Sequence, residues 1–332
     1  MAGKFAVTAA RYIRVESFHC WAVTSPAKLA AMHIGFGLPQ YGNMANHTEQ
    51  ITEFAVGVEK LGAASLWVGD RALAPTSPTL GFARTGPGPF PTQLRVVFDP
   101  FVALTLAAAH TSRVRLGSSV LNAPWYSPLL LARSLTAIDH VSRGRLIAGL
   151  GLGWSPDEFG AVGVPFEDRG ARLDEFLDVL DAIWLGDPVE HEGDRWRIPA
   201  SHIDLRPVQH PRPPLYLGGT APAALARIGA RADGWLPSVM VPGAAGVDEL
   251  RRRWDVVRDH AVRAGRAPDA VDAVVRVDVR SGTPLDAIGD VLGAIERAGF
   301  DHAFVELIGL ARDAAEAVDI AAELLTVAAP IS

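Results

Sequence analysis

The sequence has few of the residues on which several classes of protein chemistry depend. It contains one cysteine, Cys20, in 332 residues, so neither an internal disulfide nor a cysteine-rich metal cluster is expected. The ten histidines show no H-E-x-x-H or comparable ligand spacing, and no G-x-S-x-G sequence marks a serine nucleophile. No apolar run reaches the length that spans a membrane. We therefore expect no dedicated metal site and no nucleophilic acyl chemistry.

Lysine and excess charge are also scarce. Lysine occurs only at positions 4, 28 and 60, arginine carries almost all of the positive charge, and the formal net charge is −6. Because this charge is mild and dispersed, we expect no nucleic-acid partner and no membrane partner. Residues 1–31 lack the continuous apolar segment of a secretory signal. We interpret them as a disordered or dispensable extension before a single domain over residues 32–332, in a cytoplasmic protein.

From Met32 onward, short β-rich segments alternate with helical periodicity. The strand candidates are nearly continuous apolar runs, which are typical of parallel strands covered on both faces: His33–Leu38, Ser65–Gly69, Val114–Leu121, Arg145–Leu150, Pro214–Leu217, Gly234–Pro237, Val274–Val279 and Ala303–Leu307. Apolar residues at i, i+3, i+4 spacing predict helices over Thr48–Leu61, Asp99–His110, Ser127–Val141, Arg169–Leu185, Ala221–Ala230, Val247–Ala264, Pro284–Ala298 and Arg312–Ala328. Thr48 is the expected N-cap of the first helix. Strands that each precede a helix, eight times over, predict an α/β fold of the (β/α)₈ TIM-barrel type, ahead of an open doubly wound sheet.

Two long segments interrupt this rhythm, one after the second strand and one after the fourth. Arg71–Phe98 is rich in proline, glycine and threonine, and it follows the carboxyl end of a strand, where barrels of this type carry their active sites. Asp187–Arg212 contains Gly193-Asp194 between two short polar-apolar runs, which predicts a hairpin. Loops of this length in a compact domain are usually functional.

The sequence RLIAGLGLGW at 145–154 is similar to a dinucleotide-binding turn, but its details differ. Such a turn needs G-x-G-x-x-G before a helix and an acidic residue about 20 positions later at the end of a strand. Here the spacing is G-x-G-x-G, and the region 20 positions later has the pattern of an amphipathic helix. Two interpretations remain open: a tight bend with close packing, or small residues that allow a flat ring to approach the backbone.

Other strand ends carry polar groups. Gly218-Gly219-Thr220 lies between a strand and a helix, and it predicts either a backbone anion site or an ordinary turn with Thr220 as N-cap. Asp70 and Arg71 follow the second strand, and Ser119 and Asn122 lie near the end of the third. A barrel with no visible nucleophile or metal site indicates that an organic cofactor supplies the difficult chemistry.

Five stretches carry a resemblance to a known family: IGFGLPQ at 34–40, SLWVGDR at 65–71, the block from 113 to 163, RGARLDE at 169–175, and PPLYLGGTAPAALARIGARADGWLP at 213–237. Together they resemble the bacterial luciferase-like family of flavin- or deazaflavin-dependent oxidoreductases. The family is built on the TIM-type barrel and binds FMN or coenzyme F420. The resemblance extends from Met32 to the C-terminus and is less specific in the last quarter of the chain.

The resemblance implies roles for individual residues. A non-prolyl cis peptide under the central cofactor ring would fall at Ser119–Val120, with Asn122 reaching ring or chain atoms. Gly151 and Gly153 would line the rim beside the ring, whereas Gly218, Gly219 and Thr220 would bind the phosphate. Asp70, Arg71 and Trp154 would lie near the reactive ring and are the expected catalytic residues. Arg84 and Arg95 are candidates for contacting an anionic cofactor tail.

Two departures from the family pattern limit which reactions and substrates are expected. Many members have a histidine where this chain has Arg71, and arginine stays protonated, so it serves as an electrostatic group rather than a base. The sugar-phosphate dehydrogenase branch has a catalytic glutamate where this chain has Trp154, which argues against glucose 6-phosphate. The resemblance favours coenzyme F420 over FMN and hydride transfer to or from a small-molecule substrate. The alternatives are an FMN-dependent monooxygenase and a non-catalytic cofactor carrier; many relatives form homodimers.

Overall fold

A computed structural model describes residues 32–81, 90–241 and 245–327. All of these residues belong to one compact unit, Ala31–Ser332. The proposed extension, residues 1–31, lies outside the described residues, so the domain boundary after residue 31 stays a prediction. Among the described residues, no helix is both long enough and apolar enough to cross a membrane.

The main sheet consists of eleven parallel strands that follow the predicted apolar runs: β1 His33–Gly37, β2 Ser65–Val68, β3 Arg115–Ser118, β4 Leu121–Asn122, β5 Leu146–Gly151, β8 Leu215–Gly218, β9 Gly234–Leu236, β10 Ser238–Val241, β11 Asp272–Ala273, β12 Val275–Val279 and β13 His302–Glu306. Three pairs, β3 with β4, β9 with β10, and β11 with β12, are consecutive pieces of one strand path separated by one or two residues. The described strands therefore occupy eight positions, as predicted.

These positions form a ring. β1 pairs with β2 on one side and with β13 on the other, and the pairing continues through β3, β5, β8 and β9. The β9–β10 path then pairs with the β11–β12 path, and β12 pairs with β13. The (β/α)₈ TIM-type barrel is confirmed, since every strand position has a parallel neighbour on both sides.

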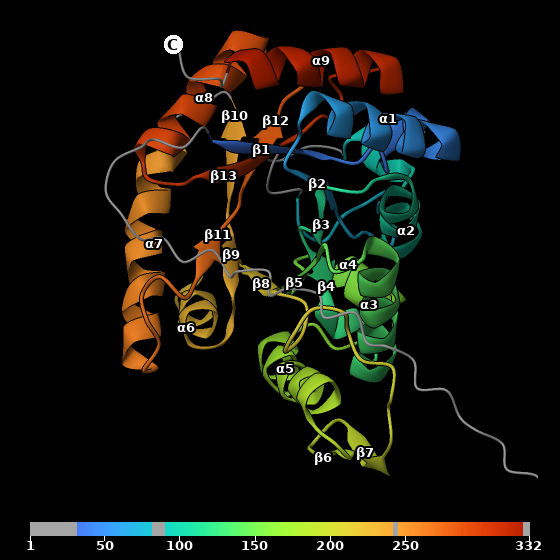
Figure 1. Cartoon of the computed structure of the whole chain (residues 1–332), viewed down its shortest axis with the longest axis vertical. Coiled ribbons are helices and arrows are strands. Elements are labelled where there is room, and N and C mark those ends of the chain that lie inside the picture. The colour runs from blue at the N-terminus through green and yellow to red at the C-terminus, as the bar shows by residue number, and fades with distance from the viewer. Residues whose placement is uncertain (1–31, 82–89, 242–244, 328–332) are drawn as a thin grey trace, which may run out of the picture. The chain divides into compact units, whose positions relative to one another are not determined.

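The helices of the described residues are α1 Thr48–Leu61, α2 Pro100–His110, α3 Pro128–Ser142, α4 Pro156–Ala161, α5 Arg169–Leu185, α6 Pro222–Arg231, α7 Ala245–Arg263, α8 Leu285–Arg297 and α9 Ala314–Val327, with short 3₁₀ helices η1 Gly42–Asn46, η2 Thr92–Arg95 and η3 Ala123–Trp125. Most of the longer helices surround the ring of strands (Figure 1), whereas α4 and η2 belong to loops between strands and helices. Neighbouring helices such as α1 and α2, α2 and α3, and α8 and α9 contact each other, and buried apolar residues of the helices and of the strands form one core cluster.

Two local details differ from the sequence prediction. The N-cap of α1 is His47 rather than Thr48, because Thr48 is already the first helical residue. The third strand is interrupted after Ser118 and resumes at Leu121, so the predicted Val114–Leu121 strand is two pieces. The predicted hairpin in the second insertion is confirmed as β6 Val189–Glu192 and β7 Arg197–Ser201, which pair antiparallel beside α5.

The inside of the barrel is closed by large side chains. Trp67 stacks on Phe304 with ring centroids 4.9 Å apart, and both pack with Ile147, Tyr216, Leu236 and Val274. Gly117 leaves room for this stack, since a Cβ there would lie 2.4 Å from the Trp67 ring. These side chains therefore fill the barrel interior at the level of the Trp67–Phe304 stack.

Candidate active site

A cavity of about 1280 Å³ lies at the carboxyl ends of the strands, among the loops that follow them. Its size exceeds the roughly 300–1,000 Å³ typical of small-molecule sites, and its position is that of the active site in enzymes of this architecture. It is lined by all of the predicted catalytic, ring-binding and phosphate-binding residues: Asp70, Arg71, Ser119, Val120, Asn122, Gly151, Gly153, Trp154, Gly218, Gly219 and Thr220. The structure thus brings these residues together, while their individual roles stay predictions.

The interruption between β3 and β4 has an unusual backbone. The Ser119–Val120 peptide is cis although no proline follows, as the family resemblance implied. The Val120 side chain packs against two glycines from neighbouring strands: a Cβ at Gly151 would lie 2.3 Å from its Cγ2, and one at Gly218 would lie 3.0 Å from its Cγ1. Glycine at both positions therefore makes room for Val120 on the cavity wall.

Gly149 and Gly153, the other glycines of the 149–153 segment, are required for different structural reasons. A Cβ at Gly149 would lie 1.6 Å from the Ser118 carbonyl oxygen, so the two strands could not approach as they do. Gly153 has a φ of +75°, a conformation that residues with a Cβ rarely adopt. Of the two interpretations left open by the sequence, close packing accounts directly for the missing Cβ atoms, and Val120 rather than empty space faces Gly151.

Asp70 is tied to the segment after the interruption. Its Oδ2 accepts hydrogen bonds from the Asn122 backbone N–H at 2.9 Å and from the Tyr126 hydroxyl at 2.9 Å, and its carbonyl accepts from the Asn122 amide at 3.1 Å. Burial raises the pKa of Asp70 to about 6, although these two donors to its carboxylate act in the opposite direction. A carboxyl group with such a pKa can exchange a proton near neutral pH.

Arg71 is held by a partner that the sequence did not indicate. Its guanidinium donates to Glu158 Oε2 at 2.8 Å, and both side chains are buried. The guanidinium also lies over the rings of Phe90 and Trp154, 4.7 Å and 5.1 Å from their centroids. Glu158 is on the short helix α4, which was not predicted, and it also accepts from the Ala72 N–H at 2.9 Å. The Arg71–Glu158 pair brings equal and opposite charges to the cavity.

A second buried group of charged side chains was also not identified from the sequence. Arg276 and Asp278 point inward from β12, and Arg276 donates to Asp278 Oδ1 at 2.8 Å and to Glu306 Oε2 on β13 at 2.9 Å. Its third contact is the Ser119 carbonyl oxygen at 2.6 Å. Burial opposes the charge, but Asp278 and Glu306 raise the pKa of the Arg276 guanidinium above its ordinary value. The alternation of apolar and charged residues in VRVDV at 275–279 was the available signal. We call Arg276, Asp278 and Glu306 the arginine cluster.

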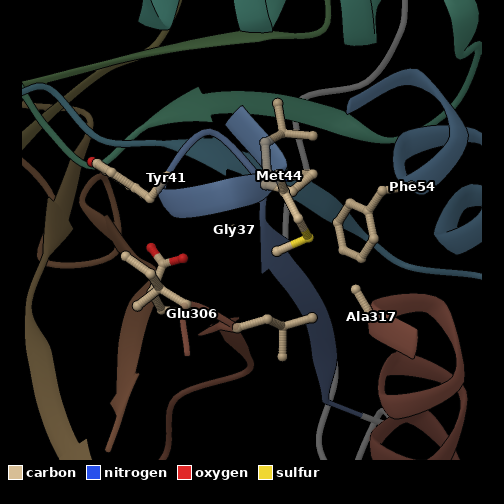
Figure 2. A pocket seen from close by; sticks show the side chains of 10 residues that line it. Gly37, Tyr41, Met44, Phe54, Glu306 and Ala317 are labelled. Carbon is tan, nitrogen blue, oxygen red and sulfur yellow. The ribbon is translucent and has the colours of Figure 1, made fainter. Parts of the chain in front are cut away.

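The Glu306 side chain packs against β1. The Glu306 carboxylate lies on the Gly37 backbone, where a Cβ would be 2.4 Å from Oε1. It points to the side of β1 on which Tyr41 lies, whereas Met44, Phe54 and Ala317 lie on the other side (Figure 2). The space among these side chains is about 10 Å³, which is room for about one water molecule. This small pocket is too small for a substrate, so the large cavity is the candidate site.

Backbone groups at the start of α6 face the cavity. Gly218 ends β8 and Gly219 follows it, and Ala221 rather than Thr220 occupies the N-cap position, with no side chain capping the helix. The first N–H groups of α6 therefore have no side-chain acceptor, and a helix N-terminus of this kind attracts anions. The Trp235 indole donates to the Gly219 carbonyl at 2.9 Å and holds that peptide in place.

The cavity lining includes two arginines that the sequence did not single out as site residues. Arg169, at the start of α5, and Arg280, just after β12, line the cavity without a carboxylate partner in the described part of the chain. Of the arginines named beforehand, Arg95 is exposed in η2 and does not line the cavity, and Arg84 lies outside the described residues. In the same described ranges, no group of three or more acidic, histidine or cysteine side chains could hold a metal ion.

The family now follows from the comparison with known sequences. The sequence model described as luciferase-like monooxygenase matches residues 30–282, which is most of the chain. The chain belongs to the luciferase-like monooxygenase family. As a family member it is a flavin- or deazaflavin-dependent oxidoreductase or monooxygenase, and both cofactors occur among its structural neighbours.

Individual relatives differ in the chemistry that their names state. An uncharacterized protein of Mycobacterium tuberculosis is 30% identical over 224 residues, covering 67% of this chain and 76% of the relative. Limonene 1,2-monooxygenase of Rhodococcus erythropolis is 26% identical over 230 residues, covering 69% and 54%. The solved structure of an F420-dependent secondary alcohol dehydrogenase, with an F420–acetone adduct, superposes with a TM-score of 0.71 at 16% identity, covering 90% of this chain and 99% of that one. At that identity the structural likeness shows the fold.

Proposed function

We propose that this family member binds coenzyme F420 and transfers a hydride between the deazaflavin and a small organic substrate. The observation that carries the choice of F420 is the pair of arginines, Arg169 and Arg280, which line the cavity without carboxylate partners in the described ranges. The F420 tail carries carboxylates that FMN lacks, and guanidinium groups not already bound to a carboxylate are suited to bind them; Arg169 is held toward the cavity by its bond to the Phe166 carbonyl at 2.8 Å.

The residues present fit such a cofactor. Val120, set between Gly151 and Gly218, gives an apolar wall without protruding neighbours, and the uncapped N-terminus of α6 beside Thr220 offers donors for a phosphate. A cavity of about 1280 Å³ has room for more than one drug-sized molecule by the usual range of roughly 300–1,000 Å³. In this proposal Val120 and Gly151 contact the ring, Gly218 to Thr220 hold the phosphate, and Arg169 and Arg280 hold the tail.

When bound, the deazaflavin supplies hydride donation or acceptance at its C5 atom. The protein then has three tasks: to orient the substrate, to exclude water and to move one proton. Trp154 and Phe90, stacked at 6.0 Å with an interplanar angle of 13°, form an apolar wall beside the Arg71–Glu158 ion pair, whose two charges cancel. Asp70, whose pKa burial raises to about 6, is the group we assign to hold or donate a proton at its carboxyl oxygen while Asn122 and Tyr126 fix its orientation.

The runner-up is an FMN-dependent monooxygenase; the name of the limonene relative supports the monooxygenase chemistry. The two proposals differ in a direct binding measurement. We expect titration of the purified, cofactor-free protein to give at least a roughly tenfold lower Kd for F420 than for FMN, the difference that about 1.4 kcal/mol of extra tail binding produces. Equal or tighter FMN binding would reject the F420 assignment.

A matched pair of variants tests the arginine argument. Arg169→Ala combined with Arg280→Ala is expected to weaken F420 binding and to leave FMN binding within twofold, whereas Arg95→Ala, at an exposed position away from the cavity lining, changes neither. A non-catalytic carrier would bind F420 tightly, yet no alcohol or other hydride donor in a substrate panel would reduce the bound ring.

A further inference from the structure

Arg276 reaches three different segments of the barrel from one buried position. It is 7% exposed, and its guanidinium spans Asp278 on its own strand, Glu306 on β13, and the Ser119 carbonyl oxygen across the barrel. The two carboxylates fix the guanidinium from one side. Through its contact with Ser119, Arg276 therefore links strands β12 and β13 to the segment between β3 and β4.

The Ser119 carbonyl belongs to the peptide group that joins Ser119 to Val120. Moving this carbonyl rotates the backbone that carries the Val120 side chain, which is already confined by Gly151 and Gly218 on the cavity side of β5 and β8. Ser119 is also held by its own N–H, which donates to the Val68 carbonyl at 2.7 Å. Ser119 is therefore held at two atoms, its N–H by Val68 and its carbonyl oxygen by Arg276. The next residue, Val120, forms part of the cavity wall.

The chemistry of the cluster indicates more than a role in packing. Replacing a buried ion cluster by apolar residues of similar volume is often neutral or stabilising, because charges lose hydration when they are buried. The layer directly beneath, where Phe304 and Trp67 stack, is closed by aromatic and aliphatic side chains without an ion pair among them. Arg276, its guanidinium carbon 5.8 Å from the Phe304 ring centroid, begins the charged layer at the point where the barrel opens into the cavity.

We propose that Arg276 is a positioning residue: through the Ser119 carbonyl it sets the place of Val120, and with it the wall on which the cofactor ring rests. The proposal rests on the proposed function in that a flat-ringed cofactor occupies the cavity. It does not depend on which of the two cofactors is bound. Arg276 acts through Ser119 and Val120 rather than by contact with the reacting atoms.

A double-mutant cycle on the full-length protein tests this assignment. Arg276→Lys keeps the charge and loses the forked geometry, and Val120→Ala removes the wall directly; each is expected to weaken cofactor binding by roughly tenfold, the effect of one charge-assisted contact or one buried side chain. Because both changes act on the same element, the double variant should bind no more than about twofold more weakly than either single variant. Additive losses, or an unchanged Kd in folded Arg276→Lys protein, overturn the proposal.

Arg145 provides the matched control. It also binds several backbone carbonyls, those of Ala108, Thr111, Val114 and Ser142, but at the opposite end of the barrel. Arg145→Lys is expected to lower the unfolding midpoint without changing the cofactor Kd. If Arg276→Lys does not fold, Asp278→Asn, which keeps the guanidinium and its Glu306 contact, replaces it in the cycle with the same criterion.

The titration uses both F420 and FMN, so that two failures can be told apart. If only FMN binds, the F420 assignment fails and the cycle is carried out with FMN. If neither binds the wild-type protein, the proposed function fails, and crystal structures of the wild-type and Arg276→Lys proteins decide the inference. Val120 in the same position in both structures would then overturn it.

Discussion

The two ends of the barrel interior both contain buried polar side chains, but they use them differently. At the amino ends of the strands, the Trp67 indole donates to Ser65 Oγ at 2.8 Å, and Ser65 Oγ lies 2.8 Å from His302 Nε2. Burial lowers the pKa of His302 to about 3, so these three residues, the N-terminal polar cluster, are uncharged at neutral pH. At the carboxyl ends, Arg71–Glu158 and the arginine cluster are charged and line or border an open cavity.

This difference shows that buried polarity alone does not identify a site. The N-terminal polar cluster joins its three side chains by hydrogen bonds to one another, and its Trp67 ring stacks on Phe304. At the carboxyl end, the charged side chains are costly to bury, and they lie beside the large cavity. Charge next to an opening, rather than polarity within the barrel, therefore distinguishes the functional end, and three variants, each with a control variant, test this contrast.

The largest effect is expected from breaking the ion pair at the carboxyl end. Glu158→Leu leaves the Arg71 guanidinium buried without its carboxylate, and removing one partner of a buried pair costs about 3–5 kcal/mol. It also removes the acceptor of the Ala72 N–H. Urea unfolding monitored by tryptophan fluorescence measures the change in the free energy of unfolding.

The control for this variant removes both charges. Arg71→Leu combined with Glu158→Leu should recover most of the loss, because two apolar side chains of similar volume can replace a buried pair at little cost. A double variant as unstable as Glu158→Leu alone would mean that the lost hydrogen bonds to the loop, and not the uncompensated charge, dominate.

A smaller effect is expected at the amino end. Ser65→Ala removes the acceptor of the Trp67 indole N–H, and an unsatisfied buried donor costs about 1–3 kcal/mol. Because the partners are neutral and distant from the cavity, the cofactor Kd should remain unchanged. Thr52→Ala, which removes a hydroxyl bonded to the Glu49 carbonyl on the surface of α1, should change stability by less than about 0.5 kcal/mol. A Kd shift in Ser65→Ala would break the contrast between the two ends.

The sequence was sufficient for the architecture because parallel strands covered on both faces must be apolar throughout. It also predicted which residues surround the cavity, since residues that follow parallel strands gather at one end of a barrel. The partners of those residues were not predictable in the same way. Arg71 and Glu158 are 87 positions apart, and Arg276 and Ser119 are 157 apart, so only the packed barrel determines that they meet.

Gln40 illustrates the same limit. It lies within the IGFGLPQ stretch that carried the family resemblance, but nothing in its spacing indicated a contact. Its side-chain amide pairs with both backbone groups of Gly69, at 2.7 Å and 2.8 Å, and is completely buried. This contact holds the end of β2 just before Asp70 and Arg71, so a residue with no apparent chemistry supports two that were predicted from their position.

Of the three cavity and barrel variants, Asp70→Asn is expected to change the stability at pH 7 least and to have the most specific pH dependence. The amide oxygen can still accept hydrogen bonds from Asn122 and Tyr126, so we expect a loss at pH 7 of less than about 1 kcal/mol. The pKa of Asp70 is raised from 3.8 to about 6, so the protonated carboxyl is favoured in the folded state. Its stabilising contribution is therefore complete below about pH 4 and is lost as the pH rises through about 6. Urea unfolding of wild-type and variant proteins from pH 4 to 7.5 measures this difference directly.

Asp157, on the neighbouring helix turn, gives a control of the opposite sign. Hydrogen bonds from the Thr79 hydroxyl and backbone N–H lower its pKa, so its contribution is present above the ordinary pKa of an aspartate and is lost as the pH falls. The stability difference between wild type and Asp157→Asn should therefore shrink toward acidic pH, whereas that for Asp70→Asn should shrink toward neutral pH. If both differences followed the same direction, burial at the cavity would not be the cause of the Asp70 shift, and Asp70 would no longer be the group to which the proton transfer is assigned.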